Sequence, residues 1–229
     1  MCTVSGPIAV PAGRRDNEGM RLYLSSYELG DHPSEFTAMV RGSGHGWLIM
    51  NALDGADPEV RHRETARQVS ALAGLGLAAS ELDLRVHDAE SLSATFGYPD
   101  FLWVRGGNVF TLRAALARSG ADALIVEQLG LDAFVYAGFS AGACVLAPSL
   151  AGFEACDSTE DAVSLNGGAE FDGLSILDRP LVPHLVSPKH PENAALTRVA
   201  RAYALAGKPY WALRDGDALV VDGNRVVLL

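Results

Sequence analysis

One short segment of the chain places a hydroxyl group between two glycines. Gly138, Ser140 and Gly142 form a G-x-S-x-G pattern, which follows an apolar run and precedes a stretch of small residues. This combination is typical of a nucleophile elbow, in which a strand turns sharply into a helix and exposes the serine hydroxyl. Glycine on both sides gives such a turn the space it needs. The pattern predicts Ser140 as a catalytic nucleophile, and a buried turn of small residues is the structural alternative.

A serine nucleophile also needs a general base. Among the six histidines, His184 is the strongest candidate, because it follows the apolar run 181–183 and precedes two further apolar residues. That position is typical of a strand end in the C-terminal part of the chain. Three of the four histidines before the elbow lie in helix-rich or turn contexts typical of exposed side chains. A histidine buried for packing alone is the alternative for His184.

Acyl transfer further requires N–H groups that stabilise an oxyanion. Residues 105–108 carry two consecutive glycines at a predicted strand end. Because this strand end is expected beside the elbow, the N–H groups of Gly107 and Ala141 are predicted to converge on one oxygen. Asn108 is also expected to cap the helix that follows.

Strand and helix signals alternate around these residues. The sequence predicts strands over 22–26, 46–51, 82–86, 101–104 and 133–137, helices over 34–41, 58–75, 110–129 and 192–205, and a hairpin over 218–227. Repeated βα units with apolar strands indicate an α/β fold, with a mostly parallel central sheet and helices on both faces. The hairpin, with Asp222 and Gly223 in its turn, is expected to complete the fold at the C-terminal side.

Composition limits the remaining possibilities. The chain has 229 residues, of which 48% are hydrophobic, so one large domain over 20–229 is expected. Residues 1–19 lack a regular pattern and are predicted to be a disordered extension. A net charge of −10 with 18 dispersed basic residues argues against a nucleic-acid surface. The three cysteines have no metal-ligand spacing, so free thiols in a cytoplasmic protein are expected, with no metal and no membrane segment.

Four segments together resemble one known family. Residues 21–27, 106–110, 138–143 and the Pro183-His184 pair are similar to motifs of the dipeptidase E and cyanophycinase family of serine peptidases. The resemblance runs from about residue 20 to the C-terminus. It implies a glutamine-amidotransferase-like, flavodoxin-like three-layer fold, with serine in place of the amidotransferase cysteine. It also implies Ser140 as nucleophile, His184 as base, Gly107 and Ala141 as oxyanion donors, a short peptide as substrate and no cofactor.

The acid of the triad is taken from the same resemblance. It implies a carboxylate on the strand after the elbow helix, and Glu154, Asp157, Glu160 and Asp161 all fall in that window. Glu154 lies in the apolar run 152–156, where a carboxylate is costly unless a hydrogen bond compensates. Glu154 is therefore predicted to orient His184, with Asp157 as the second candidate.

The substrate is less well determined by the motifs. Family members that cleave after an N-terminal aspartate use an arginine shortly after the histidine motif, but here Ala194 stands at about that position and Arg198 one helical turn later. The resemblance thus implies peptide hydrolysis without strict aspartyl specificity. Asn108, His190 and Glu192 are expected to contact the substrate, although solvated side chains at a helix start are the alternative for the last two.

Several other functions are compatible with the same motifs. A catalytically silent binding or sensory domain could retain this fold, and a cyanophycinase-type hydrolase is a further alternative. An α/β-hydrolase fits less well, because too few residues follow Ser140 for the βα units that those enzymes place between acid and base. The oligomeric state is left open, with a homodimer as one alternative.

Overall fold

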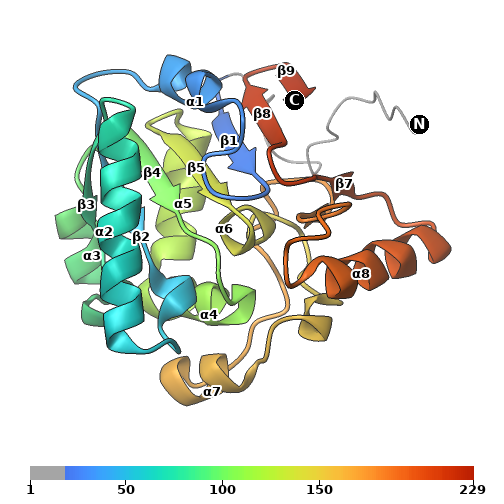
Figure 1. Ribbon diagram of the computed structural model, residues 1–229. Helices are drawn as coiled ribbons and strands as arrows, with labels where there is room; N and C mark the ends of the chain where they lie inside the picture. Colours follow the sequence, from blue (N-terminus) through green and yellow to red (C-terminus); the bar gives the residue numbers. More distant parts are fainter. Residues whose placement is uncertain (1–18) are drawn as a thin grey trace.

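A seven-stranded sheet forms the centre of the molecule. Figure 1 shows the computed structural model, which describes residues 19–229; apart from Gly19, the predicted N-terminal extension lies outside the described residues. The strand order is β3-β2-β4-β5-β1-β8-β9, and the first five strands in this order are parallel to one another. Strand β8 is antiparallel to both of its neighbours, β1 and β9. The strands of this sheet are β1 (Arg21–Ser25), β2 (His45–Ile49), β3 (Ala78–Glu81), β4 (Phe101–Val104), β5 (Val135–Phe139), β8 (Ala218–Asp222) and β9 (Arg225–Leu228).

Helices cover both faces of this sheet, as the sequence predicts (Figure 1). Successive residues of a strand point to opposite faces, so Leu22 and Leu24 of β1 join one apolar cluster and Tyr23 joins the other. Helices α1 and α2 contribute to the Tyr23 cluster, and α3, α4, α5, α6 and α8 to the Leu22 cluster. The α-helices are α1 (Pro33–Met39), α2 (Pro58–Gly74), α3 (Ala89–Phe96), α4 (Val109–Ser119), α5 (Ala121–Gly130), α6 (Ala141–Cys144), α7 (Glu160–Asn166) and α8 (Asn193–Leu205).

Short elements complete the architecture. Three 3₁₀ turns, η1 (Asn51–Leu53), η2 (Leu84–Val86) and η3 (Phe153–Ala155), follow strands or the elbow region. Strands β6 (Leu181–Val182) and β7 (Trp211–Ala212) pair in parallel as a separate two-stranded sheet. Between residues 19 and 229, no helix has both the length and the apolar character needed to cross a bilayer.

Two predicted elements differ from the structure. The strand expected over 82–86 is wrong: the edge strand β3 ends at Glu81, and Asp83 accepts a hydrogen bond from the N–H of Arg85, which turns the chain into η2. The helix expected over 110–129 is two helices, α4 and α5, because Gly120 adopts a left-handed conformation with φ of 76°. The predicted C-terminal hairpin is confirmed, with Asp222 opposite Arg225.

The turn between β5 and α6 explains both glycines of the G-x-S-x-G pattern. Ser140, between them, has φ of 50° and ψ of −119°. A Cβ atom on Gly142 would lie 2.1 Å from the carbonyl oxygen of Val104 in β4, and one on Gly138 would lie 2.8 Å from the same oxygen. Both positions therefore need glycine because β4 leaves no room for a Cβ atom, in addition to the space that the turn itself needs.

We predict that Gly142→Ala lowers the free energy of unfolding by at least about 2 kcal/mol, because a methyl group there must displace the backbone of β4. Gly130→Ala is the matched control: it ends α5, and no heavy atom lies within 4 Å of its Cβ position. That variant should be neutral or more stable by about 0.5–1 kcal/mol. Urea unfolding of both variants measures the difference, and equal stabilities would contradict the close-approach explanation.

Candidate active site

The structure brings Ser140 and His184 into hydrogen-bonding contact. His184 Nε2 lies 3.1 Å from Ser140 Oγ, and the histidine side chain is almost fully buried. The main chain of His184 is held on both sides: its N–H donates to Ser26 Oγ at 2.8 Å, and its carbonyl accepts from Asn193 Nδ2 at 2.6 Å. His184 itself has φ of 57°, a left-handed conformation that is uncommon for a non-glycine residue. These contacts fix the imidazole relative to the elbow.

Asp215 is the carboxylate that contacts the other side of the imidazole. Its Oδ1 lies 2.6 Å from His184 Nδ1 and also accepts a hydrogen bond from Ser26 Oγ at 3.1 Å. The Asp215 N–H donates to Ser187 Oγ at 2.9 Å. A neutral imidazole that donates from Nδ1 to this carboxylate has its Nε2 lone pair directed at the serine. Ser140, His184 and Asp215 therefore form the geometry of a catalytic triad.

The predicted acids lie elsewhere, and the prediction that Glu154 or Asp157 orients His184 is wrong. Residues 153–155 form a 3₁₀ turn rather than a strand, so Glu154 is exposed and accepts a hydrogen bond from the Gly152 N–H at 2.6 Å. Asp157 accepts from the Val109 N–H at 2.8 Å, at the start of α4. The sequence does contain a signal for Asp215, since it lies two residues after the apolar run 211–213 and precedes a glycine before the strand that starts at 218.

The loop 105–108 packs against the elbow from the end of β4. A Cβ atom on Gly106 would lie 2.7 Å from Ser140 Cβ, and one on Gly107, whose φ is 143°, would lie 2.6 Å from the Ala52 carbonyl oxygen. Among the hydrogen bonds between described residues, none has the N–H of Gly107 or Ala141 as its donor. Both predicted oxyanion donors therefore belong to segments beside Ser140 and are available to a ligand.

Asn108 has the capping role that its position predicts. Its Oδ1 accepts from the N–H groups of Phe110 and Thr111, each at 3.0 Å, and its Nδ2 donates to the Ser158 carbonyl at 2.7 Å. Since both ends of the side-chain amide are engaged, the structure gives Asn108 a role in positioning the loop rather than a free group for a substrate.

A second histidine packs flat on the first. The rings of His184 and His190 are stacked with centroids 3.5 Å apart and an interplanar angle of 5°, and the ring of Tyr27 meets both edge-on. His190 Nδ1 accepts a hydrogen bond from the Glu192 N–H at 3.3 Å. The sequence expected His190 near the substrate, and the structure places it against the base instead.

The side chains of His184, His190 and Glu192 lie close together, as metal ligands do. Ligand atoms of His184, His190 and Glu192 lie within 4.8 Å of one another. Imidazole nitrogens bind a metal in the plane of the ring, and two parallel rings stacked 3.5 Å apart cannot both direct a lone pair at one ion. The arrangement as it stands does not fit a metal site.

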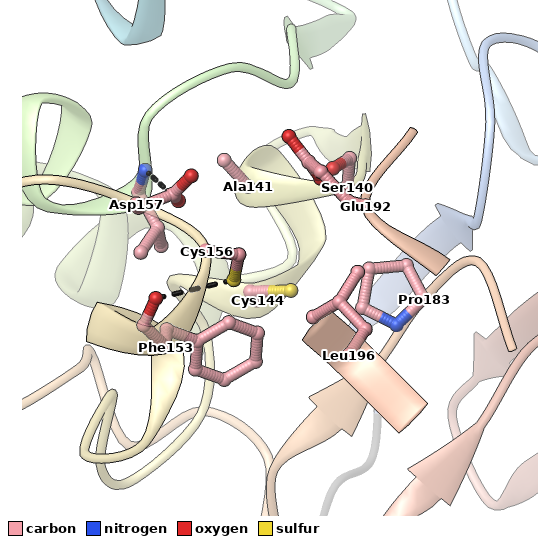
Figure 2. Close-up of a pocket in the computed structure, with 10 residues that line it drawn as sticks. Ser140, Ala141, Cys144, Phe153, Cys156, Asp157, Pro183, Glu192 and Leu196 are labelled. Carbon is pink, nitrogen blue, oxygen red and sulfur yellow. Dashed lines mark hydrogen bonds between the residues drawn. The ribbon is translucent and has the colours of Figure 1, made fainter. Parts of the chain in front are cut away.

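A small pocket adjoins the serine. Its cavity volume is only about 10 Å³, and Figure 2 shows the side chains of Ser140, Asp157 and Glu192 around it. The remaining walls come mainly from apolar side chains and two thiols; the full lining is Val109, Ser140, Ala141, Cys144, Phe153, Cys156, Asp157, Pro183, Glu192 and Leu196. Glu192 is thus at the pocket, as the sequence expects, together with Asp157.

Burial changes the acid–base properties of these groups. Burial lowers the pKa of His184 below its ordinary value, an effect that the neighbouring His190 reinforces and the hydrogen bond to Asp215 opposes. Burial raises the pKa of Asp157 to about 6, and burial together with the charge of Asp157 raises the pKa of Glu192 to about 7. Burial also raises the pKa of the Cys156 thiol to about 12 and that of Cys144 well above its usual range, so neither cysteine is a thiolate near neutrality. The hydroxyl of Ser140, by contrast, is in contact with the imidazole of His184.

Comparison with known proteins agrees with this geometry. Residues 60–229 match Peptidase family S51. The chain is 32% identical over 157 residues to an uncharacterized peptidase of Listeria monocytogenes, covering 69% of this chain and 73% of that protein. It is 30% identical over 217 residues to a Peptidase E of Streptomyces coelicolor, covering 92% of this chain and 71% of that protein.

A solved structure supports the same relationship. A putative Peptidase E protein from Listeria monocytogenes superimposes with a TM-score of 0.74 at 25% identity, covering 92% of this chain and 98% of that one. The fold that the sequence resemblance implies is therefore confirmed, and the protein is a serine-type peptidase that belongs to Peptidase family S51.

Proposed function

We propose that this peptidase hydrolyses short peptides through an acyl-enzyme intermediate, with Ser140 as nucleophile, His184 as general base and Asp215 as the orienting acid. The observation that carries the proposal is the continuous hydrogen-bonded path from Asp215 Oδ1 to His184 and on to Ser140 Oγ, at 2.6 Å and 3.1 Å. A domain that only binds ligands gains nothing from holding both Ser140 and His184 at positive φ, with the backbone strain that this costs.

Each step of the reaction has a group positioned for it. His184 Nε2 removes the proton from Ser140 Oγ as the oxygen attacks the peptide carbonyl, and the N–H groups of Gly107 and Ala141 are proposed to bind the resulting oxyanion. The imidazolium then gives that proton to the leaving amine as the C–N bond breaks. Water, activated by the same nitrogen, hydrolyses the ester and restores Ser140. Asp215 keeps the correct tautomer and stabilises the imidazolium.

The substrate is proposed to be a short peptide without a requirement for aspartate in first position. Ala194 and Arg198 are exposed on α8, and neither lines the pocket beside Ser140. The pocket instead contains Asp157 and Glu192. Of the three predicted substrate contacts, we retain Glu192 as a pocket residue and propose that Asn108 and His190 act by positioning the loop and the base. A cyanophycinase-type substrate remains the second candidate only through the family resemblance.

Ser140→Ala should abolish peptide hydrolysis and leave the fold intact, because only Oγ is removed from a site built of small residues. A fluorophosphonate probe should label the wild-type protein and not the variant, while the far-ultraviolet circular dichroism spectra of the two coincide. Equal labelling of the two proteins would refute the assignment of the nucleophile.

The role of Asp215 can be tested by replacing its carboxylate with an amide of the same shape. Asp215→Asn should lower kcat by about 10⁴-fold, since an amide at this position favours the wrong imidazole tautomer. Glu154→Gln, the matched carboxylate-to-amide change at the exposed residue, should leave kcat within about two-fold, as is usual for surface substitutions. Steady-state kinetics on a hydrolysed dipeptide measures both values. A larger loss in the Glu154 variant would return the role to that residue.

The pH dependence of labelling by the fluorophosphonate probe measures the pKa of His184. This measurement does not depend on the charge of a peptide substrate. Labelling needs neutral His184, and burial lowers the pKa of that group, so the rate should fall only as the pH drops below the ordinary value of 6.5. His190→Phe keeps an aromatic ring on His184 but removes a neighbour whose positive charge lowers the pKa of the base. The midpoint should therefore move to higher pH in this variant. A midpoint above 6.5 in the wild type would contradict the assigned environment of His184.

A further inference from the structure

The pocket beside Ser140 contains two carboxyl groups and no basic side chain in its lining. Its two ionisable carboxyl groups belong to Asp157 and Glu192, and its lining residues include no lysine, arginine or histidine. Apart from Ser140, the other lining side chains are apolar or bear thiols, and one of the apolar ones is Leu196 of α8 (Figure 2). A carboxyl group in such surroundings loses hydration that a partner must replace.

The protein itself provides few hydrogen bonds to replace the lost hydration of these two carboxyl groups. Asp157 receives one hydrogen bond, from the Val109 N–H at 2.8 Å. For the Glu192 carboxylate, no hydrogen-bond donor and no ion-pair partner occurs among residues 19–229 as described. The Glu192 N–H is engaged with His190, which holds the backbone of this residue while its carboxyl group faces the pocket.

The acid–base behaviour of the two groups is that of buried carboxyl groups without a cationic partner in the pocket lining. Burial raises the pKa of Asp157 to about 6, and burial with the nearby Asp157 charge raises the pKa of Glu192 to about 7. A positive group placed between them would favour the ionised form of both and lower both pKa values. An added negative group would do the reverse and would have to enter as a neutral acid.

The chemistry at Ser140 determines which part of a peptide reaches this pocket. In the acyl-enzyme, the carbonyl carbon bonded to Ser140 Oγ is directly bonded to the Cα atom of the acyl residue. That Cα carries both the amino group and the side chain. Once the leaving amine has departed, these two substituents are the parts of the acyl residue that can reach a pocket whose wall includes Ser140 and Ala141.

We propose that the pocket binds a primary ammonium group of the substrate's first residue and excludes an acidic side chain. Asp157 and Glu192 accept its hydrogen bonds, and the apolar walls keep water from competing for them. The inference rests on the proposed function, because the pocket is a substrate site only if Ser140 forms the acyl-enzyme. The ammonium group is either the free amino terminus or the side-chain amine of lysine, and the two sources are distinguished by blocking one of them.

Binding is measured by calorimetry on the Ser140→Ala protein, which cannot turn over the peptides. The probes are alanyl-alanine, its N-acetyl derivative, N-acetyl-lysyl-alanine and aspartyl-alanine. If the amino terminus is bound, acetylation of alanyl-alanine should weaken binding about ten-fold or more, the size expected for charge-assisted hydrogen bonds. If the side-chain amine is bound, N-acetyl-lysyl-alanine should recover that loss. Aspartyl-alanine should bind more weakly than alanyl-alanine in both cases.

The roles of Asp157 and Glu192 are tested by replacing each carboxylate with the amide of the same shape. Adding Glu192→Gln to Ser140→Ala should remove most of the difference between the ammonium-bearing and acetylated peptides, and adding Asp157→Asn should reduce it independently. Glu154→Gln in the same background is the control, because this exposed carboxylate lies outside the pocket, and it should leave the difference unchanged. Should the Glu192 variant fail to fold, the Asp157 variant and the peptide series on Ser140→Ala alone still decide the question.

Two results would overturn the inference: equal affinities for the free and acetylated peptides together with no gain from the lysine side chain, or tightest binding of aspartyl-alanine. Failure of the proposed function has a different signature, which is a wild-type protein that the fluorophosphonate probe does not label. Labelling at Ser140 with charge-independent peptide binding would refute only the ammonium pocket, and charge-dependent binding without labelling would refute only the catalytic role.

Discussion

The site depends on the close contact between the carbonyl oxygen of Val104 and the backbone of the elbow. Positions 138 and 142 both approach this one oxygen so closely that neither has room for a Cβ atom. The contact sets the depth of the turn, and with it the height of Ser140 above the ends of β4 and β5. It also brings the loop after β4 against the serine, since Gly106 has no room for a side chain beside Ser140 Cβ. Ser140 and the loop 105–108 are thus positioned by one interaction between two neighbouring parallel strands.

The buried hydroxyl of Ser26 links the two segments that carry His184 and Asp215. Ser26, directly after β1, accepts from the His184 N–H and donates to Asp215 Oδ1, so it joins three segments that are far apart in the chain. Segments 184–187 and 213–215 are adjacent because β6 and β7 are parallel and end side by side. His184 and Asp215 therefore both follow strands of one small sheet, and the hydrogen bonds of Ser26 link that sheet to the central one next to the elbow.

Much of this arrangement follows from local sequence, and the rest does not. The parallel sheet, the elbow, the C-terminal hairpin and the cap at Asn108 each have a signal within a few residues, because they depend on apolar periodicity, small residues or a side chain that bonds its own backbone. The pairing of His184 with Asp215 depends on two-residue strands, β6 and β7, whose pairing is non-local and too short to leave a pattern. The apolar neighbours of Glu154 predict a buried carboxylate, but Gly152 has φ of 107° at the start of a 3₁₀ turn, in which the Glu154 side chain is exposed.

The strand order also determines when the site can first exist during synthesis. β1 is among the first elements made, yet it lies between β5 and β8, so one of its edges stays unpaired until residues 218–222 have left the ribosome. Asp215 lies just before that strand. A nascent chain thus contains the elbow and His184 before it contains Asp215, and the pairing of β8 with β1 can form only after Asp215 has been made. The order of translation delays peptidase chemistry until the fold that confines it is nearly complete.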